Sequence, residues 1–253
     1  MDQVKTLRDQ TGISIMQCKK ALEEADGDNE KALLILRKQS GSVAQKKASR
    51  NASDGIIITK QSDSKALIFM IHSETDFVAR NNEFQTLAQK LATTAFDSGI
   101  EKMTEESIVE IPLIVQKVGE NIQLGETVIV EGSTLGAYNH NGKVAVVVSL
   151  NGGTPALAKD IAMHVAAMKP QYITKENIPA DAKEKARSFF EEEVAKENKP
   201  AEIKEKILDG KLGTYFKEIT LIEQPFIKDP SKTISQLLKD AGAEIKSFDL
   251  KAI

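Results

Sequence analysis

The order strand, turn, strand, helix occurs twice along this chain, and that repetition constrains the fold more than any other feature. The first copy has β-rich runs at 56–58 and 66–72, joined across Ser62-Asp63. Its helix is indicated by apolar residues at helical spacing: Phe84, Leu87, Leu91 and Ala95. Because neighbouring runs can pair as hairpins, antiparallel sheets are favoured over a doubly wound parallel sheet.

The second copy has strands at 135–138 and 143–150 around His140-Asn141-Gly142, and an Ala-rich helix over 155–168 that ends at Lys169-Pro170. Between the copies we expect a helix over 108–118 and a strand over 126–131. After the second copy, Ser231 is expected to begin a helix, and 245–250 to return as an edge strand. The core is therefore predicted to contain two related α+β subdomains, residues 55–133 and 134–253.

Residues 1–41 predict a small three-helix domain. The first helix covers Val4–Asp9 and is broken at Gly12, and Ser14 begins the second helix with Gln17 in a capping box. Asp28 caps the third helix, which is expected to end at Gly41. The apolar face of the second helix is predicted to be Ile15, Cys18, Leu22 and Ala25. The polar, locally basic stretch 42–54 is then expected to be a linker, which could be partly helical.

Residues 181–216 are charged and helix-favouring, with an interruption at Asn198-Lys199-Pro200. That pattern predicts two antiparallel helices that project from the second subdomain as a helical hairpin. The predicted fold class is therefore α+β: a three-helix N-terminal domain, two related subdomains with antiparallel sheets, and a helical-hairpin protrusion.

The charge balance argues against general nucleic-acid binding. Lys and Arg number 34 and Asp and Glu number 37, giving a net charge of −3 without the usual basic excess. No apolar run is long enough to span a bilayer, and the N-terminus lacks the layout of a signal peptide. The single cysteine, Cys18, excludes an internal disulfide and suits a reducing compartment. We therefore expect a cytoplasmic protein without direct nucleic-acid or membrane contact.

The junction between the second strand and the helix is longer in the first copy than in the second. In the second copy the strand is connected to the helix by "NGGTP", residues 151–155. In the first copy the connection takes up most of "SETDFVARNNEF", residues 73–84. One interpretation is structural: Thr75 caps a helical turn while Phe77 and Val78 pack into the core. The other is functional: Phe77 is an exposed aromatic anchor beside Asp76, suited to a partner's groove.

Four segments carry recognisable motifs, at 7–22, 75–84, 160–170 and 224–240. They read "LRDQTGISIMQCKKAL", "TDFVARNNEF", "DIAMHVAAMKP" and "QPFIKDPSKTISQLLKD". In this order they resemble motifs of the elongation factor Ts family, the guanine-nucleotide exchange factors of the GTPase elongation factor Tu. The resemblance implies the fold predicted above, with the hairpin as a coiled coil.

The resemblance also implies a mechanism and a heterodimeric complex with that GTPase. Thr75, Asp76, Phe77 and Val78 match the residues that disturb the partner's Mg²⁺ and phosphate site, with Asp76 and Phe77 entering between two of its helices. Further positions implied to contact the partner are Arg8, Met16, Lys19, Ala79 and His140.

From the residues alone, other roles stay open for these positions. Met16 could fill a core, Arg8 and Lys19 could be solvated charges, and His140 could be a turn residue. Some members carry a further C-terminal helical segment with no counterpart after 251–253, so its contacts are not carried over.

An enzyme and an adaptor are the competing classes. His72, His140 and His164 are scattered, and none is spaced from Cys18 or a carboxylate as metal ligands are. Neither a nucleophile elbow nor a phosphate-binding loop is present, so no active site, cofactor or small-molecule substrate is expected. Three-helix modules the size of residues 1–41 also occur in adaptors, but the remaining motifs favour an exchange factor.

Overall fold

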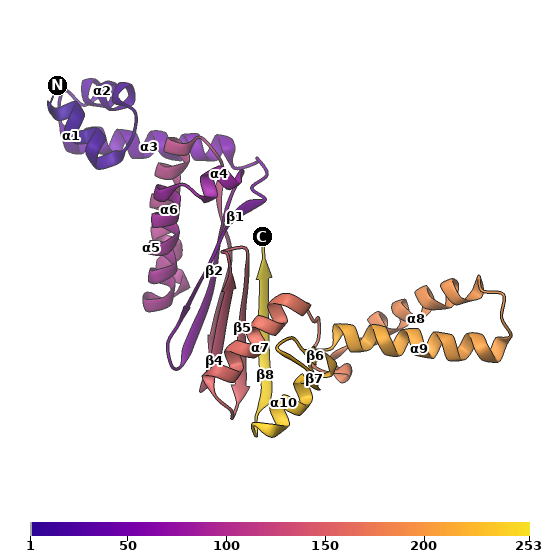
Figure 1. The fold of residues 1–253 in the computed structure, drawn as a ribbon. Helices are drawn as coiled ribbons and strands as arrows, with labels where there is room; N and C mark the ends of the chain where they lie inside the picture. The colour runs from indigo at the N-terminus through magenta and orange to yellow at the C-terminus, as the bar shows by residue number, and fades with distance from the viewer. Residues whose placement is uncertain (1) are drawn as a thin grey trace.

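The computed structural model describes residues 2–253, and its N-terminal module consists of three helices. These are α1 (Asp2–Thr11), α2 (Ile15–Glu24) and α3 (Asn29–Lys47). Their shared core contains Leu7, Cys18, Ala21, Ala32 and Leu36, all fully buried. The module occupies one end of an elongated molecule (Figure 1).

Three local predictions for this module are wrong. Helix α3 does not end at Gly41 but runs on to Lys47, because Val43 and Ala44 pack against the next core and offset the small cost of a helical glycine. Ile15 is 57% exposed and does not belong to the buried face of α2. Ser14 does cap α2, but the predicted capping box does not form. The Gln17 side-chain oxygen accepts from the Ser14 hydroxyl at 2.8 Å and not from the Ser14 backbone amide.

The first unit is a three-stranded antiparallel sheet with helices on one face. Its strands are β1 (Asp54–Gln61), β2 (Lys65–Ser73) and β3 (Ile122–Glu131), in the order β1-β2-β3. Its helices are α4 (Asp76–Ala79), α5 (Asn82–Ser98) and α6 (Ile100–Val118). The predicted stripe on α5 is confirmed, since all four of its residues are buried. Helix α6 begins directly after Gly99, two turns before the predicted start.

The second unit repeats this plan with a different third strand. Its sheet has the order β4-β5-β8, formed by β4 (Thr134–His140), β5 (Val144–Asn151) and β8 (Glu244–Ala252). Helix α7 (Pro155–Met168) matches its predicted bounds, and β8 is the predicted edge strand. The remaining elements are η1 (Lys175–Asn177), η2 (Leu221–Glu223), β6 (Pro225–Phe226), β7 (Asp229–Thr233) and α10 (Ile234–Asp240). The predicted helix start at Ser231 is wrong, because Ser231 lies in β7 and Thr233 caps α10.

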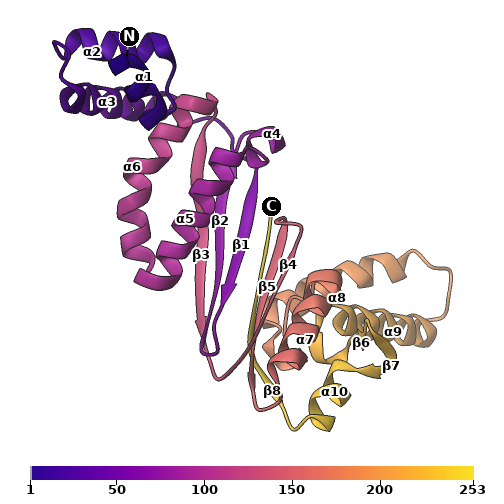
Figure 2. The ribbon, with the colours of Figure 1, turned by 60° about the vertical axis from the view of Figure 1, so that its left-hand side comes forward.

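The two sheets pack against each other, and helices cover their outer faces (Figure 2). Along β2, Phe69 and Ile71 face the helices of the first unit, whereas Ile68 and Met70 face the second sheet. Strand β5 alternates in the same way between α7 and the first sheet. Strands buried on both faces read as continuous apolar runs, which explains the run "ALIFMI". The predicted α+β class with antiparallel sheets is confirmed.

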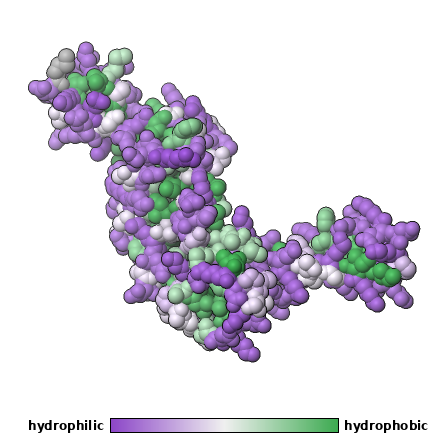
Figure 3. Space-filling model, viewed as in Figure 1, coloured by the Kyte–Doolittle hydropathy of each residue, from purple (hydrophilic) through white to green (hydrophobic). Residues whose placement is uncertain are grey.

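The predicted helical hairpin is present as α8 (Ala180–Ala195) and α9 (Ala201–Ile219). A small core of Ala186, Val194, Leu208 and Leu212 joins the two helices. The hairpin projects away from the second unit, and hydrophobic residues form a band along its visible face (Figures 1 and 3). The predicted division of the chain at residues 41, 54 and 133 stays a prediction.

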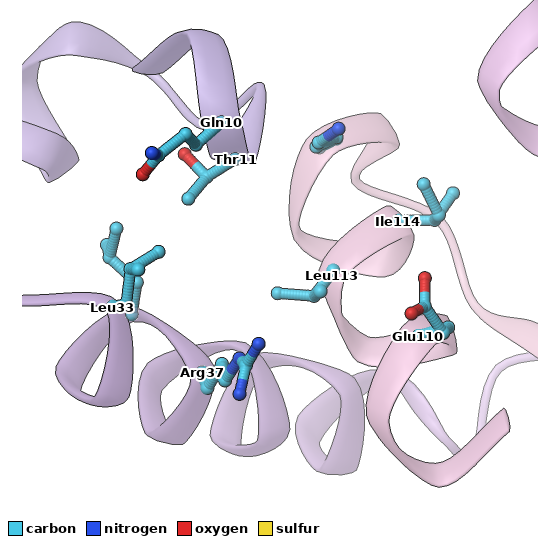
Figure 4. Close-up of a pocket in the computed structure, with 9 residues that line it drawn as sticks. Gln10, Thr11, Leu33, Arg37, Glu110, Leu113 and Ile114 are labelled. Carbon is cyan, nitrogen blue, oxygen red and sulfur yellow. The ribbon is translucent and has the colours of Figure 1, made fainter. Parts of the chain in front are cut away.

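The N-terminal module rests on α6 of the first unit. Lys47 Nζ donates to the carbonyl oxygen of Gly119 at 2.6 Å, and Ser40 hydrogen-bonds Gln116. A cavity of about 190 Å³ lies in this contact, and Figure 4 shows the residues that line it. Thr11, Leu33 and Arg37 line it from the module, and Leu113 and Ile114 line it from α6.

Candidate functional site

The long junction of the first unit is a helix broken after one turn. Residues 74–81 connect β2 to α5, whereas residues 152–154 connect β5 to α7. Both junctions contain a threonine cap in the same conformation: φ −130° and ψ 159° at Thr75, φ −131° and ψ 155° at Thr154. Each threonine side chain accepts a hydrogen bond from the amide three residues later. In the second unit the helix then continues, whereas in the first unit it stops after Ala79.

The chain restarts its helix at Asn82 because Asn81 provides a second cap. The Asn81 side-chain oxygen accepts from the amides of Glu83 and Phe84, at 2.9 and 3.3 Å. These amides would otherwise lack partners at the helix start. Two caps in succession therefore separate the single turn α4 from α5.

Helix α4 buries one side and presents Phe77 on the other. Val78 and Ala79 belong to the core of the first unit, with exposed fractions of 8% and 6%. Phe77, between Asp76 and Val78, is 83% exposed. The structural interpretation of the junction is therefore right for Val78 and wrong for Phe77. An aromatic ring that stays exposed because the buried Val78 and Ala79 fix its turn is a suitable anchor for a binding partner.

Asp76 is half-exposed and forms an ion pair with Arg80, whose Nη2 lies 3.0 Å from Asp76 Oδ2. Both side chains contact solvent, and pairs of this kind contribute little to stability. The Asp76 carboxylate can therefore change partners at low cost.

Carboxylates hold the base of α4. Thr75 donates its hydroxyl to Glu120 Oε1 at 2.7 Å and its amide to Glu120 Oε2 at 3.0 Å. The amide of Asn121 donates to Glu74 Oε1 at 2.6 Å. Sequence reasoning missed Glu74 and Glu120. Gly119, which ends α6 in the left-handed conformation just before Glu120, was the available signal.

The three predicted contact residues of the N-terminal module are all exposed. Arg8 and Lys19 line a groove of about 630 Å³ together with Ile15. Met16 is 82% exposed, so its interpretation as a core residue is wrong. Lys19 Nζ lies 3.7 Å from Glu23 Oε1 in a solvated pair.

His140 is exposed at the turn between β4 and β5, and its Nδ1 lies 3.0 Å from the Tyr138 hydroxyl. The turn contacts the start of β1, where the Ile57 amide donates to the Gly142 carbonyl at 2.8 Å. The start of β1 pairs with the end of β2, which leads into α4. His140 therefore lies at the end of the sheets from which α4 emerges.

The other histidines have structural partners. His164 is fully buried, accepts from the Ile227 amide through Nδ1 at 3.3 Å and contacts Gln224 Oε1 through Nε2 at 2.9 Å. Burial lowers the pKa of His164, which favours the neutral ring. His72 Nδ1 lies 3.2 Å from the Asp54 carbonyl oxygen. Among residues 2–253, no cluster of three His, Cys, Asp or Glu side chains could hold a metal ion.

The candidate site therefore consists of exposed side chains, Phe77 and Met16 among them, on elements that buried residues hold in place. The family model for elongation factor TS matches residues 74–252. Elongation factor Ts of Alcanivorax borkumensis is 42% identical over 259 residues, covering 97% of this chain and 91% of the relative. The protein of that name from Psychromonas ingrahamii is 44% identical over 255 residues, covering 97% and 87%. The chain therefore belongs to the elongation factor Ts family, translation elongation factors of protein biosynthesis.

No helix within residues 2–253 combines the length and the apolar character needed to cross a membrane.

Proposed function

We propose that this protein binds the GTPase elongation factor Tu in its GDP form and accelerates the release of GDP, so that GTP can reload. The observation that carries the proposal is Phe77, which is 83% exposed although the next two residues of its turn, Val78 and Ala79, are buried. Family membership supplies the class of partner. The protein acts as an exchange factor without an active site, cofactor or small-molecule substrate of its own.

The physical basis of the proposed exchange is linkage. A factor that binds the nucleotide-free GTPase more tightly must weaken nucleotide binding to it by the same ratio. Phe77 provides apolar area for insertion between two partner helices, and Asp76 provides a carboxylate whose present pairing with Arg80 is weak. Mg²⁺ bridges phosphate oxygens to protein ligands, so displacing those ligands strongly lowers the affinity of the GTPase for GDP.

The same proposal assigns contacts to the other exposed positions. Arg8, Met16 and Lys19 on the N-terminal module bind the nucleotide domain of the partner, and His140 contacts a more distant domain. Thr75, Val78 and Ala79 are not exposed positions, and they complete the inserted turn by supporting Asp76 and Phe77. The complex is a heterodimer in the cytoplasm, without direct nucleic-acid or membrane contact, in keeping with the net charge of −3.

The test is stopped-flow release of a fluorescent GDP analogue from the GTPase, with wild type and Phe77→Ala. Wild type should accelerate GDP release. The acceleration by Phe77→Ala should be at least tenfold smaller, because a central aromatic anchor typically contributes about 2 kcal/mol or more to binding. A thermal melt of each protein is the control for folding. Full activity in a folded Phe77→Ala variant would refute the role of Phe77.

Binding to the GTPase with and without excess GDP and Mg²⁺ separates exchange from an adaptor role. The exchange function predicts that GDP and Mg²⁺ weaken binding, again through linkage. Binding that is indifferent to both would instead favour an adaptor that uses the groove at Arg8 and Lys19.

A further inference from the structure

Two chain junctions at the base of α4 exchange carboxylate hydrogen bonds in a reciprocal arrangement. Glu120, after α6, accepts the amide and the hydroxyl of Thr75 at 3.0 and 2.7 Å. Glu74, before α4, accepts the amide of Asn121 at 2.6 Å. Each junction therefore supplies one carboxylate and one backbone donor to the other. We refer to these four residues as the carboxylate clamp.

A third junction, between α3 and β1, is tied to the clamp. The Asn121 side chain is buried and donates through Nδ2 to the Arg50 carbonyl oxygen at 2.7 Å. Arg50 Nη1 lies 3.5 Å from Glu74 Oε1. The segment that leaves the N-terminal module is thus fixed to the same polar cluster as α4.

The backbone around Gly119 makes the clamp possible. Gly119 adopts φ 78° and ψ 8°, and its amide donates to the Val115 carbonyl, which ends α6. The left-handed turn directs the chain back, so that Glu120 and Asn121 meet the exit of β2. Lys47 secures the turn through the Gly119 carbonyl at 2.6 Å.

Helix α4 needs such support because it is one turn long. An isolated turn this short is unstable, since nucleation fixes several dihedral angles for one hydrogen bond. Phe77 cannot anchor it from within the protein, because its ring is 83% exposed. Its attachments include the buried Val78 and Ala79 on one side, the Gln85 side chain that donates to the Ala79 carbonyl at 3.4 Å, and the Thr75–Glu120 contacts at the N-terminal end.

We propose that Glu120 is a positioning residue for exchange: it holds Thr75, and through this cap it fixes the direction in which Phe77 leaves the surface. The proposal rests on the proposed function, in which Phe77 enters the partner. Ordering the turn in advance removes an entropic cost from insertion. Loss of Glu120 should therefore slow the displacement step while leaving the initial encounter through the N-terminal module unchanged.

The experiment compares wild type with Glu120→Ala, Glu120→Gln and the control Glu110→Ala. Glu110 lies on α6, ten residues before Glu120, and its carboxylate pairs with Lys90 of α5 at 3.0 Å. Gln retains one carbonyl oxygen, so it can replace part of the clamp. The readouts are amide hydrogen exchange at Thr75 and the GDP-release rate as a function of factor concentration.

In Glu120→Ala we expect the Thr75 amide to exchange about tenfold faster and the maximal release rate to fall about tenfold. The half-saturating concentration should stay within about twofold of wild type. Glu120→Gln should lie between wild type and Glu120→Ala, and Glu110→Ala should match wild type. If Glu120 had a merely structural role, its loss would lower the melting temperature, but it would not lower the maximal release rate at an unchanged half-saturating concentration.

Three results would overturn the inference: unchanged Thr75 exchange in Glu120→Ala, an unchanged maximal release rate despite faster exchange, or an equal loss in Glu110→Ala. If Glu120→Ala does not fold, Glu120→Gln is judged by the same criteria, with smaller expected changes. Failure of wild type to accelerate GDP release would overturn the proposed function instead. Thr75 amide exchange, measured on the free protein, would then still decide whether Glu120 orders α4.

Discussion

Phe84 on α5 is fully buried in the core of the first unit, whereas Phe77, seven residues earlier in the junction that leads to α5, is 83% exposed. Val78 and Ala79, between them in sequence, pack in the core with Phe84. The two neighbouring aromatic side chains are thus separated: Phe84 packs in the core, and Phe77 is available for binding.

This separation predicts that alanine substitution lowers stability strongly at Phe84 and hardly at all at Phe77. Phe84→Ala should lower the free energy of unfolding by about 3–5 kcal/mol, because it leaves a cavity in a packed core. Phe77→Ala should change it by less than about 0.5 kcal/mol, because an exposed ring loses few contacts. Urea unfolding of both variants measures the difference. A large loss of stability in Phe77→Ala would show that the ring packs in solution.

Glycines at 119 and 41 should also respond oppositely to alanine. Gly119 has φ 78°, a conformation that costs an alanine about 1 kcal/mol, so Gly119→Ala should destabilise the protein. Gly41 lies inside α3, and a Cβ atom added there would meet no atom within 4 Å. Gly41→Ala should therefore stabilise the protein by about 0.5–1 kcal/mol. Chemical denaturation tests both, and a shift of the same sign in the two variants would contradict this account.

Gly136 of β4 allows α7 to approach its sheet closely. A Cβ atom there would lie 2.1 Å from the Lys159 nitrogen and 2.2 Å from the Ala158 carbonyl carbon, both in the α7 backbone. Gly136→Ala should therefore displace α7 and cost about 1–3 kcal/mol or more through overpacking. Thermal melts compare it with Gly210→Ala on α9, where no atom lies within 4 Å and the melting temperature should not fall. Tolerance of Gly136→Ala would show that α7 can move away cheaply.

His164 should make stability depend on pH. Burial lowers the pKa of His164 in the folded protein below the usual 6.5. At pH values between the folded-state pKa and 6.5, the unfolded chain therefore binds more protons than the folded chain. The free energy of unfolding should therefore fall as pH drops below about 6.5. His164→Gln should reduce this dependence, whereas His140→Gln, at an exposed position, should retain it. Urea unfolding from about pH 7.5 to about 5.5 measures the slopes, and equal slopes in wild type and His164→Gln would refute the assignment.

Local patterns predicted the elements well where one physical signal dominated. The stripe from Phe84 to Ala95 and the turn at Asn141-Gly142 were found because periodicity and turn chemistry are local properties. The C-terminal end of α3 and the start of α6 were predicted poorly; in α3, packing of Val43 and Ala44 outweighs the helix-breaking tendency of Gly41. The excess length of the first junction was visible from comparison of the two copies.

The sequence by itself determined the α+β plan, the repeated unit and the position of the unusual junction, because these depend on spacing along the chain. Only the tertiary structure decided that Val78 is buried while Phe77 is exposed. It also decided that Glu120 meets Thr75, residues from different junctions that no local pattern relates. Exposure and long-range hydrogen bonds depend on which surfaces the folded chain brings together, and that is settled by packing of the whole molecule.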